Sequence, residues 1–127
     1  MRRYMLRYLV VLVSVGFIAV GVAALLAPGF AAVLYGVDAI TLSARVFVRA
    51  AGARDVAIGA ILIGLLARRS DTGSVGIAVL GATLVPIFDT VSVLQVSGVQ
   101  LALILHAGSI LPMMVLAIAL LVLRDNN

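Results

Sequence analysis

Four long stretches of apolar residues make up most of this 127-residue chain, and each is long enough to cross a lipid bilayer. Inside a bilayer no water can pair with backbone N–H and C=O groups, so a spanning segment must form a helix or join a closed barrel. A helix needs about 20 apolar residues to cross. The stretches have this length, and we therefore predict an all-α transmembrane four-helix bundle with spans at 8–27, 44–67, 75–96 and 99–123.

Composition supports one integral membrane domain over residues 1–127. Apolar residues make up 65% of the chain and charged residues only 11%, whereas about a quarter of a soluble domain is charged. The chain has no cysteine and one histidine, so we expect neither a metal site nor a cofactor. The net charge of +4 comes without a basic tract, so we expect no nucleic-acid partner.

Arginines near the span ends predict the topology. They cluster before the first span, between the second and third spans, and after the fourth, which are positions on one side of the membrane. By the positive-inside rule that side is the cytoplasm, so both termini are expected there, in a multi-pass protein of a bacterial cytoplasmic membrane. The first span is expected to be retained, because its apolar run exceeds that of a cleaved signal. These arginines are Arg2, Arg3, Arg7, Arg68, Arg69 and Arg124.

The connection between the first two spans is longer than a hairpin. Pro28-Gly29 ends the first span. The apolar segment 30–35 is expected to form a short interfacial helix, with a turn after it. Aromatic side chains are common at membrane interfaces, so Phe30, Tyr35 and Tyr8 are interpreted as interfacial anchors.

Ionisable residues inside the spans are the strongest functional signal, because such groups are costly in a bilayer and usually face the bundle interior. At about 1.5 Å per residue, Arg54 and Asp55 lie roughly 15 Å from the outer edge, and Asp89 and His106 roughly 10 Å. Arg49 lies roughly 7 Å deep by the same measure. Three helices therefore bring opposite charges and an imidazole to similar depths in the outer half of the membrane.

Helical periodicity distinguishes the charged residues of the second span. Arg45 and Arg49 share one face, with Asp55 on its flank, whereas Arg54 points nearly opposite to Arg45. Arg49 and Asp55 are therefore the better candidates for an internal pocket. Arg54 is expected either to pair with Asp89 or to extend its charge toward the membrane surface.

Each polar residue also has a purely structural interpretation. Arg54 and Asp55 can form an ion pair that fixes the bundle, and Asp89 can serve as a counter-ion to an arginine. His106 can be a core histidine bonded to a carbonyl, or a proton shuttle oriented by Asp89. Arg49 can reach the headgroups or clamp an anionic or carbonyl group of a ligand.

Three stretches together resemble a known family of small four-span proteins. They are 27–37 (APGFAAVLYGV), 49–59 (RAAGARDVAIG), and Asp89 followed by His106-Ala-Gly108. The pattern is similar to the domain of unknown function numbered four-two-six-seven, which is loosely DoxX-like. The resemblance implies a four-span bundle with no settled activity, whose polar and glycine positions include Arg49, Arg54, Asp55, Asp89 and His106.

Three functions fit these residues. The first is a polar intramembrane pocket that binds a lipophilic small molecule, with Arg49, Arg54 and Asp55 as ligand-binding residues. The second is a cofactor-free isomerase or cyclase with Asp89 and His106 as its acid/base pair. The third is a proton-coupled transporter that uses Asp89 and works as a homo-oligomer, since four spans are few for one transporter. The lipid bilayer is the expected surrounding in all three.

Overall fold

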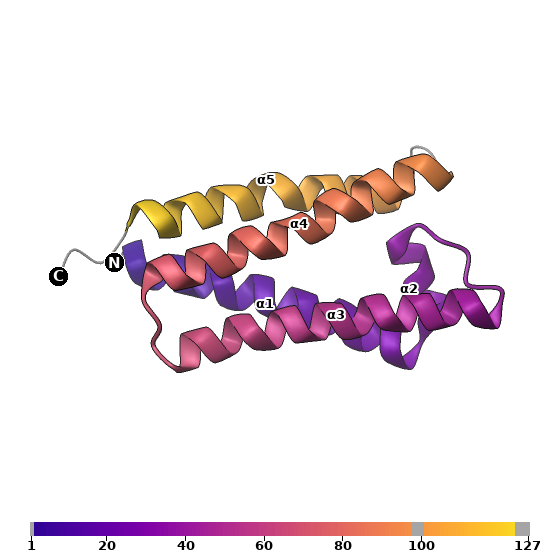
Figure 1. The fold of residues 1–127 in the computed structure, drawn as a ribbon, viewed down its shortest axis with the longest axis horizontal. Coiled ribbons are helices and arrows are strands. Elements are labelled where there is room, and N and C mark those ends of the chain that lie inside the picture. The colour runs from indigo at the N-terminus through magenta and orange to yellow at the C-terminus, as the bar shows by residue number, and fades with distance from the viewer. Residues whose placement is uncertain (1, 98–100, 124–127) are drawn as a thin grey trace.

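The protein is an all-α bundle in a computed structural model that describes residues 2–97 and 101–123. Four of its five helices are long and apolar enough to cross a membrane, which makes it a multi-pass membrane protein. The fifth, α2, is short (Figure 1). The helices are α1 (Arg2–Leu26), α2 (Pro28–Tyr35), α3 (Leu42–Ala67), α4 (Thr72–Ser97) and α5 (Leu101–Val122).

The helices begin and end close to the residues that hydropathy indicates. The first extends further than expected, because α1 begins at Arg2 while the apolar run begins at residue 8. Polar residues at a helix end do not stop the backbone from continuing its hydrogen bonds. Residues 99 and 100, at the expected start of the last span, lie outside the described residues.

The four long helices pack as two antiparallel pairs, α1 with α3 and α4 with α5. Figure 1 shows the N-terminus, the α3–α4 connection and the C-terminal end of α5 at one end of the bundle, which we call the terminal end. Helix α2 lies at the other end, which we call the α2 end. The arginine clusters expected on one side of the membrane therefore fall at the terminal end, apart from Arg124, which lies outside the described residues. That this end faces the cytoplasm stays a prediction from the positive-inside rule.

Glycines let α1 and α3 approach closely. A Cβ atom added to Gly52 would lie 2.6 Å from Ala24 Cβ, and one added to Gly59 would lie 2.6 Å from the Ser14 carbonyl oxygen. A Cβ atom added to Gly21 would lie 2.5 Å from the Gly52 carbonyl oxygen. Small residues of this kind allow helix backbones to touch in membranes, where packing rather than exclusion of water holds helices together.

A hydrophobic core joins the two helix pairs at the terminal end. Its buried side chains come from the start of α1, the end of α3, the start of α4 and the end of α5. A second cluster at the α2 end packs α2 against α1 and α3. The larger core thus joins the two pairs at the terminal end, whereas at the α2 end the apolar link to the second pair runs through the residue after α2, Gly36, which lies beside Val93 and Ala102. The first core consists of Leu6, Val10, Leu62, Val75, Val79, Leu116, Ala117 and Leu120.

Helix α2 folds back under the bundle because of its two ends. Pro28 occupies its first turn, where a missing N–H costs nothing. Gly36 ends it in the left-handed conformation at φ 68°, and its backbone N–H bonds to carbonyls of the last turn. A side chain at Gly36 would also lie 2.8 Å from Ala102 Cβ, so space as well as conformation requires glycine here.

Replacing Gly52 with leucine should separate α1 from α3. The added side chain has no space against Ala24, and overpacking of this kind costs about 1–3 kcal/mol. We expect a clear fall in the thermal unfolding temperature of the purified protein in detergent. Gly64→Leu is the matched control on the same helix, because a Cβ added at Gly64 would have no atom within 4 Å. Equal falls in the unfolding temperature of the two variants would contradict this account of the α1–α3 contact.

Candidate functional site

A cavity of about 390 Å³ lies between the two helix pairs, and all five helices contribute to its lining. Most of the wall is hydrocarbon or aromatic. The polar side chains that reach it are Tyr35, Asp55, Asp89, His106 and Ser109. The rest of the lining is Val13, Gly16, Phe17, Val20, Leu34, Val85, Pro86, Leu105, Pro112 and Met113.

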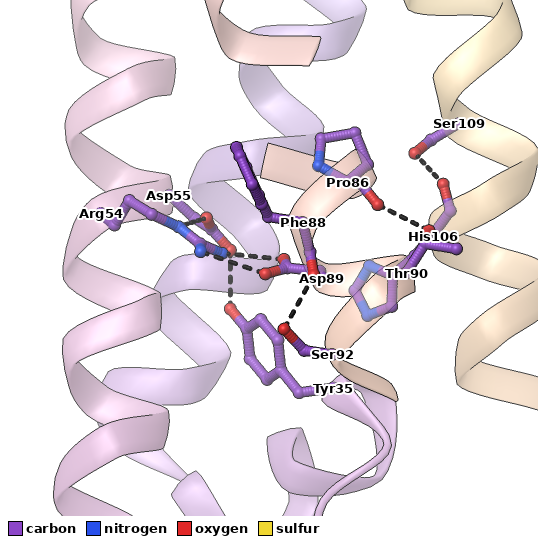
Figure 2. Close-up of polar contacts among 10 residues, drawn as sticks. All are labelled: Tyr35, Arg54, Asp55, Pro86, Phe88, Asp89, Thr90, Ser92, His106 and Ser109. Atoms are coloured by element: carbon purple, nitrogen blue, oxygen red, sulfur yellow. Dashed lines mark hydrogen bonds and ion pairs between the residues drawn. The ribbon is translucent and has the colours of Figure 1, made fainter. Parts of the chain in front are cut away.

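An ion pair between α3 and α4 lies beside this cavity. The Arg54 guanidinium donates to both oxygens of Asp89, from Nη1 at 3.2 Å and from Nη2 at 3.0 Å. Its Nε also donates to Asp55 Oδ1 at 3.0 Å. A planar guanidinium suits such two-point binding of a carboxylate. One arginine therefore holds two carboxylates and connects the two helix pairs (Figure 2).

Tyr35 completes the network from α2. Its hydroxyl donates to Asp55 Oδ2 at 2.7 Å, so both oxygens of that carboxylate have protein partners. Burial, reinforced by this hydrogen bond to a carboxylate, raises the pKa of the Tyr35 phenol well above its usual range. The hydroxyl thus stays protonated as a donor at neutral pH.

His106 faces the same cavity from α5. Its ring lies near the Tyr35 ring, with centroids 6.3 Å apart and planes inclined by 27°. Its Nε2 atom is buried and has no hydrogen-bond partner in the described part of the protein. Such orphaned polar atoms are rare in folded proteins, and each one requires an explanation.

The structure brings together four of the five predicted site residues. Asp55, Asp89 and His106 line the cavity, and Arg54 lies behind the two carboxylates and binds both. The expected pairing of Arg54 with Asp89 is therefore present. Asp89 and His106 share the cavity, but no hydrogen bond joins them within residues 2–97 and 101–123, since both oxygens of Asp89 bond to Arg54.

Arg49 lies apart from this group. Its side chain is exposed on α3, and it is not among the residues that line the cavity. The preference for Arg49 over Arg54 as a pocket residue rested on helical facing measured from Arg45. Arg45 itself donates to the Ala39 carbonyl at 3.0 Å, near the α2 end. The arginine beside the cavity is instead Arg54, whose long side chain reaches Asp89 from the flank of α3.

The interpretation of Tyr35 as an interfacial anchor is wrong. Tyr35 is only 8% exposed and bonds to Asp55, whereas Phe30 and Tyr8 are 69% and 71% exposed. The difference arises because α2 turns back toward the bundle and directs Tyr35 inward. One signal in the sequence was the Tyr35-Gly36 pair, since a glycine C-cap directly after an aromatic residue allows the chain to reverse there.

A second cavity of about 340 Å³ shares Tyr35 and Asp89 with the first. It is lined mainly by apolar residues near the start of α3 and the end of α4, including Phe47 and Val93. Tyr35 and Asp89 therefore form a wall common to both cavities. Within the described residues, no group of three or more potential metal ligands comes together.

A comparison with protein families shows the family to which the chain belongs. Residues 14–121 match the model of the Domain of unknown function (DUF4267). The chain belongs to the DUF4267 family. The match includes every residue of the Tyr35–Asp55–Arg54–Asp89 network and His106. No curated protein and no solved structure matches the chain.

This network predicts an order of stability among variants. Arg54→Leu leaves two carboxylates without a counter-ion and should lower the free energy of unfolding by about 1–3 kcal/mol. This loss of stability is smaller than the loss expected for a fully buried ion pair, because the Arg54 side chain is 37% exposed. Asp89→Asn keeps an acceptor for Arg54 and leaves the Arg54–Asp55 pair neutral. This variant should therefore lower the free energy of unfolding by less than about 1 kcal/mol.

The order can be checked by thermal unfolding of both variants in the same detergent. The double variant Arg54→Leu/Asp89→Leu should be more stable than Arg54→Leu alone, because it removes one of the unpaired charges. If Asp89→Asn were the more damaging single change, the neutrality argument would be refuted.

Proposed function

We propose that this DUF4267 protein binds a lipophilic small molecule in the cavity between its two helix pairs. The observation that supports this most is a mainly apolar cavity that also contains the buried His106 Nε2, which has no hydrogen-bond partner among residues 2–97 and 101–123. Ligand sites typically have about 300–1,000 Å³, mostly apolar walls and a few polar groups that fix orientation. The cavity agrees with this description in size and in lining.

The surrounding bilayer determines the kind of ligand. Four of the helices that line the cavity are candidate spans, so a molecule dissolved in the membrane can reach it without crossing water. The hydrocarbon part of the ligand would contact residues such as Val20 and Met113. Its polar end would lie at His106, Asp89 and Tyr35, with Arg54 and Asp55 holding those groups in place.

The carboxylate geometry favours binding over acid/base catalysis. Asp89 accepts two hydrogen bonds from Arg54, an arrangement that stabilises the charged carboxylate as a fixed acceptor. An enzyme that used Asp89 and His106 as a proton-transfer pair would need contact between them or through substrate. A ligand acceptor needs only the present geometry, so the binding role requires fewer rearrangements.

Narrowing the cavity should prevent binding. Gly16 lines it, and no atom lies within 4 Å of a Cβ added there, so Gly16→Leu would add a side chain at the cavity wall and narrow the cavity. We expect native mass spectrometry of wild-type protein, extracted gently from its own membrane, to show a bound small molecule. The same adduct should be absent from Gly16→Leu.

Gly64→Leu is the control, since it also adds leucine in open space but does not line the cavity. It should retain the adduct at the wild-type level. The proposal is overturned if wild-type protein carries no small molecule, or if Gly16→Leu carries as much as the control.

A further inference from the structure

We infer that the ligand is a lipophilic amine, bound as its ammonium ion against Asp89. This inference rests on the proposed binding function and specifies its chemistry. It starts from the charges around the cavity. Arg54 is the one cation bonded to the network within the described residues, whereas Asp55 and Asp89 contribute two carboxylates. The formal charges of these three side chains sum to one negative charge.

An uncompensated charge is costly in a membrane bundle. Moving an ionised carboxylate out of water is unfavourable unless a partner or a proton neutralises it. The chain contains no lysine, and its nearest other arginines along α3, Arg45 and Arg49, are exposed toward the α2 end. A cation brought by the ligand would therefore remove an imbalance that the protein itself leaves.

The carboxylates of the network line the cavity, and its guanidinium does not. Asp55 and Asp89 line the cavity, whereas Arg54 does not. The Asp89 side chain is 20% exposed, compared with 5% for Asp55, which Tyr35 and Arg54 enclose. Asp89 also lines the second cavity. Among the carboxylates, Asp89 is thus the one that a ligand can approach.

The other groups around Asp89 suit an ammonium ion. His106 Nε2, when unprotonated, accepts a hydrogen bond and has no protein donor within the described residues. The rings of Tyr35 and Phe17 also line the cavity, and aromatic faces attract cations in a dry environment. A lipophilic acid would instead meet two carboxylates with no cation on the lining, and a neutral alcohol would leave the excess charge uncompensated.

The test is a series of ligands that share one tail and differ in the head group. Decylamine, decanol and decanoic acid would each be titrated against the protein in nanodiscs of uncharged zwitterionic lipid, at neutral pH. Nanodiscs with Gly16→Leu give the background from partition into lipid. We expect decylamine to bind about tenfold more tightly than decanol, since a charge-assisted hydrogen bond is about twice as strong as a neutral one. Decanoic acid should bind most weakly.

Variants of Asp89 test whether the negative charge of this side chain, and not its shape, determines the preference for the amine. Asp89→Asn should reduce decylamine binding to the level of decanol in the same variant, which removes the preference for the amine. Asp89→Glu keeps the charge and should keep the preference for the amine. Asp71→Asn is the matched control, because Asp71 is an exposed carboxylate outside the cavity and asparagine can cap α4 equally well. It should bind all three ligands as the wild type does.

Each outcome bears on one of the two claims. If none of the three ligands binds above the Gly16→Leu background, the proposed binding function fails. If all three bind equally, binding stands and the amine inference is overturned. A preference for the amine that persists in Asp89→Asn would also overturn it. Should Asp89→Asn fail to fold, the wild-type series and Asp89→Glu still decide the question.

Discussion

The pairing of Arg54 with two carboxylates is the constraint on which the rest of the bundle depends. A guanidinium among apolar helices must be neutralised, and Arg54 finds Asp55 on its own helix and Asp89 on α4. Because α3 belongs to one helix pair and α4 to the other, satisfying this charge also connects the pairs. The apolar core makes the same connection at the terminal end. The ion pair adds a polar connection in the half of the bundle where the cavity lies.

The cavity follows from how differently the helices pack within and between pairs. Helices α1 and α3 touch through Gly21, Gly52 and Gly59, so little space remains inside that pair. Across the pairs, long polar side chains hold the helices at the distance that their hydrogen bonds require. Tyr35 then reaches the same point from α2 and fixes Asp55. Under the proposed binding function, this network would preorganise the site, and a preorganised site loses little entropy on binding.

The spans and the meeting of these polar residues could be predicted from hydropathy and helix geometry. Hydropathy marks the helices, and a constant rise per residue brings Asp55, Asp89 and His106 to a similar level along the bundle, where they line one cavity. Which arginine of α3 reaches the site was less predictable. A long, flexible arginine side chain can bend away from the direction of its Cα–Cβ bond, and Arg54 therefore reaches the site while Arg49 does not. Tyr35 was missed because an aromatic residue at a span boundary suits either an interface or a polar contact. Only the reversal of the chain at Gly36 decides between them, and hydropathy does not record it.

Structural and functional interpretations of the polar cluster are therefore not alternatives. Asp55 is enclosed by Arg54 and Tyr35, and it serves the scaffold. Asp89 supplies the bond from Arg54 to α4, and one carboxylate would suffice to neutralise Arg54, so the network holds one carboxylate more than its cation requires. A second carboxylate beside the first raises the electrostatic cost of the fold unless something positive binds there. Under the proposed binding function, a cationic ligand in the cavity that Asp55 and Asp89 both line would offset this cost.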